Sequence, residues 1–255
     1  MSLEIEIVPC LQDNYAVLVH EPSSKSTLCV DAPDPRPIQT ALAEKNWQLN
    51  TILVTHRHGD HTAGLDLLKS ISNPTIYGPA KEAKYIPQLD NHLEEGDTFD
   101  FAGHPIEVLE TPGHTKGHIS YHWPDDQLLF SGDTLFALGC GRIFEGSAEQ
   151  MWASLSKLAT LPKTTQIFCG HEYTLTNAEF AAKLEPSNID LQTRLIDIRA
   201  KRAKNEPTLP STLELELKTN PFLRPSSKEI RNHLNLETAP DVDVFAAIRT
   251  CKDQA

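Results

Sequence analysis

The chain has 255 residues, 39% hydrophobic and 23% charged, which are the proportions of an ordinary globular protein. Its formal net charge of −12 argues against extended contact with nucleic acid, because an acidic surface repels a polyanion. No apolar stretch approaches the roughly 18 residues that a membrane-spanning helix requires, so we expect neither nucleic acid nor a membrane among the partners.

The first 33 residues alternate short apolar runs with polar turns. The runs LEIEIVP, YAVLVH and TLCVDAP predict three strands. The start of the chain resembles neither a signal peptide nor an Arg-rich transit peptide, so we expect an N-terminal strand in a soluble, cytoplasmic protein. The five cysteines form no C-x-x-C pair, which indicates free thiols in a reducing compartment.

The rest of the chain divides into two parts. Up to residue 172, the helical patterns PIQTALAEKNW, AGLDLLKSI and AEQMWASLSKLATL alternate with strand patterns: TILVT, TIYGP, DTFDF, IEVLETPG, HISYHW, QLLFSGD and TQIFCGH. From residue 173 onward the apolar spacing is helical throughout, with Pro and Asn stops. We therefore predict a mixed α/β domain over residues 1–172 and a helical domain over residues 173–255.

These two predicted domains differ in charge. Residues 1–172 contain 11 Lys and Arg but 23 Asp and Glu, whereas residues 173–255 contain 12 of each. All of the excess negative charge therefore lies in the first domain. The neutral second domain can still attract a small anion.

Four of the predicted strands end in a residue that can bind a metal ion. His56, His114, Asp133 and His171 each follow an apolar run and lie beside Gly or Thr. In layered α/β folds, the loops beyond strand ends gather functional side chains. Hydrogen bonds within the protein rarely explain four such endings, so we expect these residues to share a ligand.

The motif THRHGDH adds further donors directly after the first of these strands. The complete set has seven nitrogen or oxygen donors and no thiolate: His56, His58, Asp60, His61, His114, Asp133 and His171. One zinc ion takes about four ligands, so seven donors suit two ions better than one. Imidazole and carboxylate suit Zn, Fe and Mn about equally, and we expect two divalent ions per chain, with zinc as the first choice.

The spacing of the donors assigns them to two sites that share Asp133. On an extended turn, the first two histidines of the motif point the same way and can hold one ion together with His114. Asp60 and His61 lie where the loop enters a helix and can turn to the other side. There they can hold the second ion together with His171.

The motifs THRHGDH, TPGHTKGH, SGDTLF and CGHE, in this order, make residues 3–172 similar to the metallo-β-lactamase superfamily. The resemblance implies a four-layer αββα sandwich with two metal ions at one edge, followed here by a smaller all-helical domain. Members of this superfamily cleave lactams, lactones, thioesters and phosphodiesters. The similarity alone therefore does not name a substrate.

One family of this superfamily, glyoxalase II or hydroxyacylglutathione hydrolase, resembles nearly the whole chain. Four segments carry this resemblance: LFALGCGRIFEG (135–146), CGHEYTLTNAEFA (169–181), NPFLR (220–224) and IRTCKDQ (248–254). The resemblance implies glutathione contacts at Arg142, Tyr173, Arg249 and Lys252, with Phe144 where some members have Tyr. Without it, Arg249 and Lys252 are more simply explained as cations at a helix C-terminus, and Tyr173 as a packing residue.

The resemblance also implies a reaction. A glyoxalase II cleaves S-(2-hydroxyacyl)glutathione, such as S-D-lactoylglutathione, to glutathione and a 2-hydroxy acid, here D-lactate, in methylglyoxal degradation. Two metal ions lower the pKa of a bridging water toward 7, and Asp60 and Asp133 position the resulting hydroxide. A thiolate leaves readily, so no general acid is needed. Arg142, Arg249 and Lys252 recruit the anionic glutathione despite the acidic protein.

Three other functions stay open on the sequence alone. A mononuclear iron persulfide dioxygenase shares the fold, but the complete second set of Asp60, His61 and His171 favours a two-metal hydrolase. A lactonase or β-lactamase needs neither the glutathione loop nor the helical tail. A non-catalytic, metal-stabilised binding module is the third, although degenerate sites usually lose ligands and this chain keeps all seven. The acidic surface favours a monomer.

Overall fold

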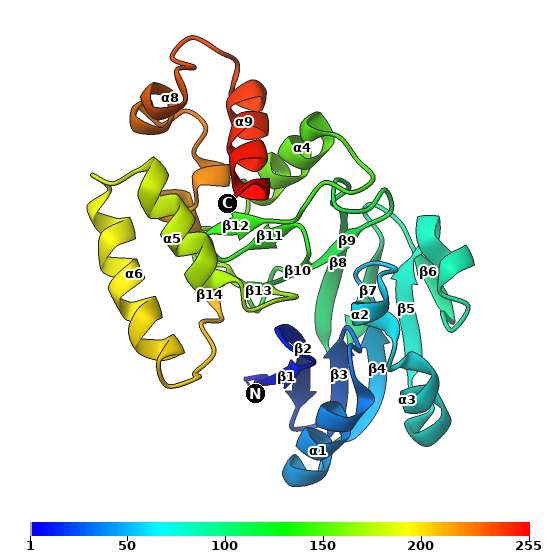
Figure 1. The fold of residues 1–255 in the computed structure, drawn as a ribbon. Coiled ribbons are helices and arrows are strands. Elements are labelled where there is room, and N and C mark those ends of the chain that lie inside the picture. The colour runs from blue at the N-terminus through cyan, green and yellow to red at the C-terminus, as the bar shows by residue number, and fades with distance from the viewer. Residues whose placement is uncertain (1) are drawn as a thin grey trace.

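The computed structural model describes residues 2–255 and shows two sheets packed face to face, with helices on the outer faces (Figure 1). The first sheet has six strands in chain order: β1 (Glu4–Cys10), β2 (Asn14–Glu21), β3 (Ser26–Val30), β4 (Gln48–Leu53), β5 (Thr75–Pro79) and β6 (Asn91–Leu93). β1 to β3 pair antiparallel, whereas β3 to β6 pair parallel. The loops that follow β3 and β4 therefore meet at the same edge of the sheet.

The second sheet, from one side to the other, consists of β14 (Ser211–Thr212), β13 (Gln166–Cys169), β10 (Leu128–Gly132), β9 (Ile119–Trp123), β8 (His104–Glu110) and β7 (Thr98–Phe101). A short hairpin follows β10 and comprises β11 (Leu135–Phe136) and β12 (Gly139–Cys140). β10 is parallel to β13, and β8 runs in the same direction because both β8 and β10 are antiparallel to β9. These three strands therefore also end at one edge.

Helices of the first two thirds of the chain cover both sheets. They are α1 (Pro35–Lys45), α2 (Gly59–Thr62), α3 (Leu65–Ser72), the 3₁₀ helix η1 (Ala80–Tyr85) and α4 (Ala148–Leu158). Asp34 caps α1 by accepting a hydrogen bond from the Arg36 N–H at 3.0 Å, and Pro35 occupies the first turn. Ser147 and Gln150 form a capping box at the start of α4.

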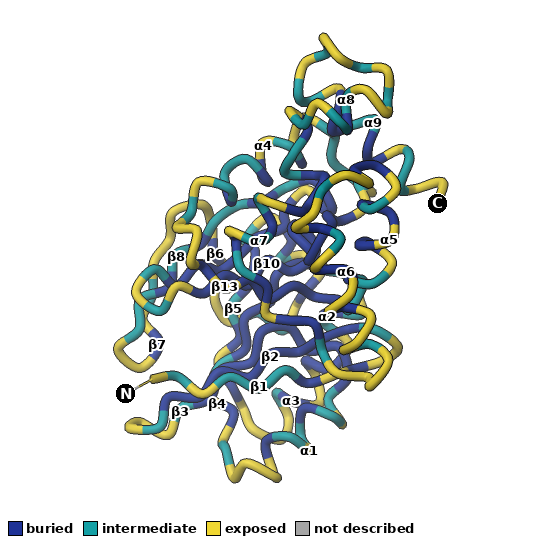
Figure 2. Tube along the Cα trace, turned by 90° about the vertical axis from the view of Figure 1, so that its left-hand side faces the viewer, coloured by how far each residue is buried: buried dark blue, intermediate teal, exposed yellow. Residues whose placement is uncertain are grey.

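Apolar side chains hold these layers together. Leu28, Trp123 and Phe130 belong to a buried cluster between the two sheets. A second cluster joins α1 and α3 to the first sheet, and a third joins α4 to the second sheet. Figure 2 shows the central strands as buried and the outer turns of the helices as exposed. The predicted αββα sandwich is confirmed.

The last part of the chain is helical, as predicted, with one exception. Its helices are α5 (Thr174–Leu184), α6 (Ile189–Arg202), α7 (Leu213–Thr219), η2 (Pro221–Leu223), α8 (Lys228–Leu234) and α9 (Asp241–Asp253). The two-residue β14 pairs with β13, so the prediction of an all-helical region is wrong at this point. Two residues are too few to show a strand period. Within residues 2–255, no helix combines the length and apolar character needed to cross a membrane.

The helical part holds the β11–β12 hairpin in place. The amide of Asn220 donates to the carbonyl oxygens of Phe136 at 3.1 Å and Gly139 at 3.0 Å. The buried carboxylate of Glu216 accepts a hydrogen bond from the Leu138 N–H at 2.8 Å. These bonds satisfy buried polar groups of the hairpin, so the helices fix the loop that follows β10.

Candidate metal centre and substrate pocket

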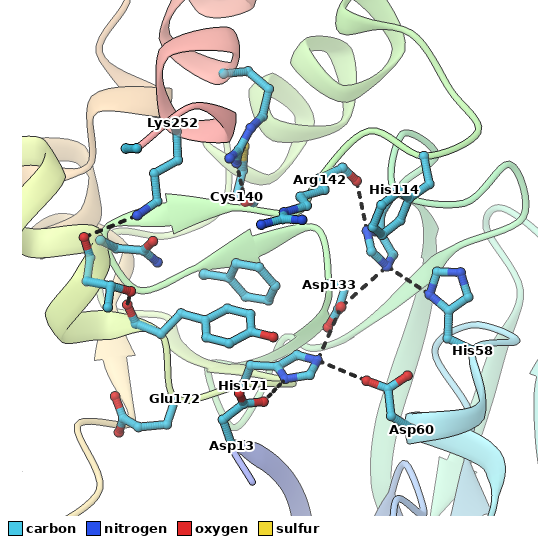
Figure 3. A pocket seen from close by; sticks show the side chains of 17 residues that line it. Asp13, His58, Asp60, His114, Asp133, Cys140, Arg142, His171, Glu172 and Lys252 are labelled. Atoms are coloured by element: carbon cyan, nitrogen blue, oxygen red, sulfur yellow. Dashed lines mark hydrogen bonds and ion pairs between the residues drawn. The ribbon is translucent and has the colours of Figure 1, made fainter.

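The seven side chains predicted as ligands converge where β4, β8, β10 and β13 end. Figure 3 shows five of them, His58, Asp60, His114, Asp133 and His171. Their donor atoms form three overlapping groups, each with all atoms within 4.8 Å: His56, His58 and His114; His56, His61 and Asp133; Asp60, His61 and His171. The first and third groups are the two sets that the sequence analysis assigns to separate ions. The second group joins them into a single cluster.

The first group directs imidazole lone pairs at a common point. His58 Nδ1 lies 3.0 Å from the Nε2 atoms of both His56 and His114. His114 Nδ1 must be the donor to the Arg142 carbonyl at 2.8 Å, because a carbonyl only accepts, and its Nε2 therefore carries a lone pair. His56 Nδ1 likewise donates to the Thr55 hydroxyl at 3.0 Å, since this hydroxyl gives its own proton to a carboxylate.

The third group, with Asp60, His61 and His171, has the same design. His61 Nδ1 donates to Asp31 at 2.8 Å, and His171 Nδ1 donates to Asp13 at 2.9 Å. The Nε2 atoms of these two histidines face each other at 3.3 Å, with the Asp60 carboxylate 3.5 Å from His171 Nε2. Two lone pairs repel at this distance, so a cation, either a proton or a metal ion, must lie between the rings.

Asp133 lies between the two groups. Its Oδ2 is 3.4 Å from the Nε2 atoms of both His114 and His171, and its Oδ1 is 3.4 Å from His61 Nε2. Oδ1 is buried and has no hydrogen-bond partner among residues 2–255. A buried carboxylate oxygen without a donor is costly unless a cation satisfies it. This orphaned atom fits a carboxylate that bridges two metal ions.

The electrostatics of the cluster also favour bound positive charge. Burial opposes a charge on His61, yet the carboxylates of Asp133 and Asp31 raise its pKa to about 9. Burial opposes ionisation of Asp133 as well, but His61 and His171 keep the pKa of this carboxyl well below its usual value. Burial and the neighbouring imidazoles lower the pKa of His56, which stays neutral as metal ligation requires.

Two glycines allow the side chains of the cluster to approach one another this closely. A Cβ atom at Gly170 would lie 2.6 Å from Asp133 Oδ1 and 2.6 Å from His61 Cε1. Gly132 has a φ of +47°, and a Cβ atom there would lie 2.6 Å from His118 Nε2. His118 accepts a hydrogen bond from the Asp133 N–H at 3.0 Å, so it helps to orient Asp133 and belongs to none of the three donor groups.

A cavity of about 700 Å³ extends from the metal cluster to α5 and α9. All five residues predicted as substrate contacts line it: Arg142, Phe144, Tyr173, Arg249 and Lys252. Tyr173 stacks on His171 with ring centroids 4.7 Å apart and planes 8° from parallel. Burial, and after it the charges of Asp13 and Asp133, raise the pKa of the Tyr173 phenol, which stays a neutral donor.

The cationic side chains at the far end of the cavity, Arg249 and Lys252, differ in the hydrogen bonds that they already make within the protein. Arg249 is only 6% exposed, and its guanidinium already donates to the Cys140 carbonyl at 2.9 Å and to Asp253 at 2.8 Å. Its Nε is buried and unpartnered among the described residues. Lys252 donates to a backbone carbonyl of α5 at 3.2 Å, and burial, followed by the charges of Arg249 and Arg142, lowers its pKa. Crowded cations of this kind are stabilised by an anionic ligand.

Sequence reasoning missed the residues behind the histidines. Asp31, Thr55 and Asp13 accept the Nδ1 protons of the ligand rings, and Asn14 donates to the Asp60 carboxylate at 3.1 Å. Such partners fix the tautomer and orientation of a ligating imidazole. One signal was present, because the apolar run of β3 also ends in an aspartate.

Comparison with known proteins agrees with this geometry. A family model of the metallo-beta-lactamase superfamily matches residues 30–171, and a model of the hydroxyacylglutathione hydrolase C-terminus matches residues 172–255. A solved structure described as BLEG-1 B3 metallo-beta-lactamase has a TM-score of 0.68 at 21% identity and covers 87% of this chain and 100% of its own. Fold and site together define an enzyme of the metallo-β-lactamase superfamily that binds divalent metal.

Curated relatives narrow this class. A hydroxyacylglutathione hydrolase of Rhizobium meliloti is 52% identical over 99% of this chain and 98% of the relative. One of Roseobacter denitrificans is 50% identical over 99% of each chain. The chain belongs to the hydroxyacylglutathione hydrolase family and is a hydrolase. Neither a persulfide dioxygenase nor a non-catalytic binding module is favoured by these relatives.

Proposed function

We propose that this enzyme hydrolyses the thioester of S-(2-hydroxyacyl)glutathione, with S-D-lactoylglutathione as the leading substrate. The products are glutathione and a 2-hydroxy acid, D-lactate for this substrate. The main support for the proposal is that one cavity extends from the metal cluster to three cationic side chains, Arg142, Arg249 and Lys252. The name shared by the relatives supports the same substrate class.

We propose seven metal ligands and two divalent ions per chain, zinc first, with iron and manganese as alternatives. The proposed ligands are His56, His58, Asp60, His61, His114, Asp133 and His171. The facing Nε2 atoms and the orphaned oxygen of Asp133 support this set. Bound ions supply Lewis-acid polarisation and lower the pKa of water toward neutrality.

Asp60 and Asp133 are the proposed catalytic carboxylates. Asn14 donates to Asp60 Oδ2 at 3.1 Å, which holds this carboxylate beside the cavity, where it would position the attacking water or hydroxide. The low pKa of Asp133 keeps this carboxylate ionised, so that it can accept a hydrogen bond from the same water. Both groups thus orient the water toward the thioester carbonyl carbon. The leaving thiolate needs little protonation because thiols ionise near pH 8.5.

The cationic end of the cavity is the proposed glutathione site. Glutathione carries two carboxylates and one amine, so Arg142 and Lys252 can bind it by charge-assisted hydrogen bonds. Arg249 adds charge there while it holds the Cys140 carbonyl, and Tyr173 offers its hydroxyl. The phenyl ring of Phe144 provides an apolar surface against which the substrate can pack. Binding at this distance from the reacting carbon positions the thioester over the metal cluster.

We assign residues 1–172 to catalysis and residues 173–255 to substrate binding. The two family models, which meet between residues 171 and 172, support this division. We propose a monomer, because a single chain supplies every side chain of the cluster and the cavity. The five free thiols suit a reducing compartment, and we propose the cytoplasm as the place of action.

A direct assay tests the proposal. The enzyme is mixed with S-D-lactoylglutathione, and the loss of thioester absorbance is followed before chelation, after chelation, and after return of Zn, Fe or Mn. We expect hydrolysis that disappears on chelation and returns with metal. Absence of hydrolysis by the metal-loaded enzyme contradicts the proposal. Oxygen uptake with glutathione persulfide, or cleavage of a β-lactam in its place, establishes one of the rival reactions.

A further inference from the structure

Phe144 places a phenyl ring at the mouth of the cavity, beside the first group of histidines. The residue is 62% exposed, and its ring centroid lies 5.2 Å from that of His114 and 6.0 Å from that of His58. An exposed phenyl ring is unfavourably hydrated, whereas a ligand packed on it removes apolar surface from water. The position of this ring therefore influences the affinity for a ligand that binds next to the cluster.

The loop between β12 and α4 carries Phe144. Hydrogen bonds fix this loop at its two ends, since the N–H of Gly141 donates to a backbone carbonyl at 3.2 Å and the N–H of Gly146 does so at 3.1 Å. Within the described chain, the N–H groups of residues 143–145 donate to no backbone carbonyl. Side chains must therefore hold the segment that presents the phenyl ring.

Glu145 ties this segment to the loop that contains the THRHGDH motif. Its carboxylate forms an ion pair with the guanidinium of Arg57 and accepts a hydrogen bond from the Lys116 N–H at 3.2 Å. The side chains of Glu145 and Arg57 are 23% and 30% exposed, so solvent screens the pair only in part. On the other side of Phe144, Ile143 packs against the core beneath α4.

Arg57 is itself held from two directions. Its guanidinium carbon lies 4.3 Å from the ring centroid of Tyr85, in a cation–π contact. The backbone N–H of Arg57 donates to the carboxylate of Glu82 at 2.6 Å. Glu82 is buried and also accepts a hydrogen bond from the Gly117 N–H at 3.1 Å. Glu82 thus holds the backbone of Arg57, and Tyr85 contacts its guanidinium, next to the histidines of the cluster.

We propose that the ion pair between Arg57 and Glu145 positions Phe144 over the cavity mouth, where the phenyl ring packs against the bound thioester. Neither charged residue is among those that line the cavity, so both are positioning residues that act through Phe144. They are expected to affect substrate binding more than the chemical step. This inference rests on the proposed function, because the thioester is the ligand.

Steady-state kinetics of single variants form the first test. Glu145→Gln keeps the shape of the side chain and removes its charge. We expect KM for S-D-lactoylglutathione to rise about fivefold, with kcat within about twofold and unchanged metal content. We expect Arg57→Ala to raise KM by about the same factor as Glu145→Gln. Arg57→Lys, which keeps the charge, should have a KM close to that of the wild type. Arg36→Ala, which removes an exposed arginine paired with Asp34 outside the cavity, is the control and should leave KM unchanged.

A double-mutant cycle separates positioning from general destabilisation. If Glu145 acts through Phe144, the variant Phe144→Ala has a raised KM that the further change Glu145→Gln does not increase. Additive effects on KM overturn the inference, and so does a parallel fall of kcat and Tm in Glu145→Gln. If the wild type hydrolyses the thioester and Glu145→Gln has the same KM as the wild type, the inference is refuted and the proposed function is not. Absence of hydrolysis by the wild type refutes the proposed function together with it.

Discussion

Asp31 is the most informative residue to change, because it supports histidines of both metal groups without touching the cavity. Its buried carboxylate accepts hydrogen bonds from the Thr55 N–H at 2.8 Å, the Thr55 hydroxyl at 2.9 Å and His61 Nδ1 at 2.8 Å. The same hydroxyl accepts the Nδ1 proton of His56. The substitution Asp31→Asn replaces one acceptor oxygen with an NH₂ group and leaves the volume almost the same.

The size of the effect follows from these contacts. In one orientation of the new amide, the NH₂ group faces the Thr55 hydroxyl and His61, and in the other it faces the Thr55 N–H. At least one buried donor loses its acceptor, at a cost of about 1–3 kcal/mol. Loss of a partner behind a ligating histidine typically weakens metal binding about 10–100-fold. We expect the Kd of the more weakly held ion to rise by that factor.

Competition with a chromophoric chelator measures this Kd. The matched control is Asp34→Asn, the same chemical change three positions along, in a carboxylate that caps α1 and contacts no histidine. We expect wild-type metal affinity in the control and about 10–100-fold weaker affinity in Asp31→Asn. Equal metal affinity in the two variants would refute the argument that Asp31 orients the ligands.

Three further predictions concern the pocket and the cluster. Lys252→Ala is expected to raise KM for the thioester about tenfold with kcat almost unchanged, because the ammonium binds the ground state and the transition state alike; a fall in kcat at constant KM contradicts this. Gly170→Ala brings a methyl group within 2.6 Å of Asp133 Oδ1. We expect loss of bound metal by elemental analysis and of about 1–3 kcal/mol of unfolding free energy by denaturant titration, and wild-type metal content speaks against the predicted clash. His61 has a pKa of about 9 in the folded, metal-free protein against a usual value of 6.5, so protonation of His61 stabilises the fold fully below pH 6.5, and this stabilisation is lost as pH rises through 9. Calorimetry of the metal-free protein should therefore show Tm falling from about pH 7 to 10, and a constant Tm refutes this assignment.

The layered fold and the donor cluster are predictable because their signals are local. Apolar residues recur with one period in the helices and another in the strands, so both kinds of layer can be recognised in the sequence. Each predicted ligand either follows an apolar run or lies in one short motif. Parallel pairing then brings the strand ends to a common edge, as the contacts of Asp133 with His61, His114 and His171 show. The short β14 is missed because two residues carry no period.

The partners behind the ligands are not predictable, because they depend on contacts between distant parts of the chain. Asp13 and His171 are 158 positions apart, and Arg57 and Glu145 are 88 positions apart. Each of these side chains is an ordinary polar residue in its local sequence. Only the packing of the two sheets shows that the carboxylates of Asp13 and Glu145 meet a ring nitrogen and a guanidinium.

A count of the metal ions in active enzyme is the sharpest test of a two-metal site. Chains are counted by amino-acid analysis, metals are counted by mass spectrometry, and activity toward S-D-lactoylglutathione is followed as zinc is returned to metal-free protein. We expect activity to rise until two ions are bound per chain, because Asp133 joins two groups of donor atoms. Full activity with a single ion per chain would contradict this expectation.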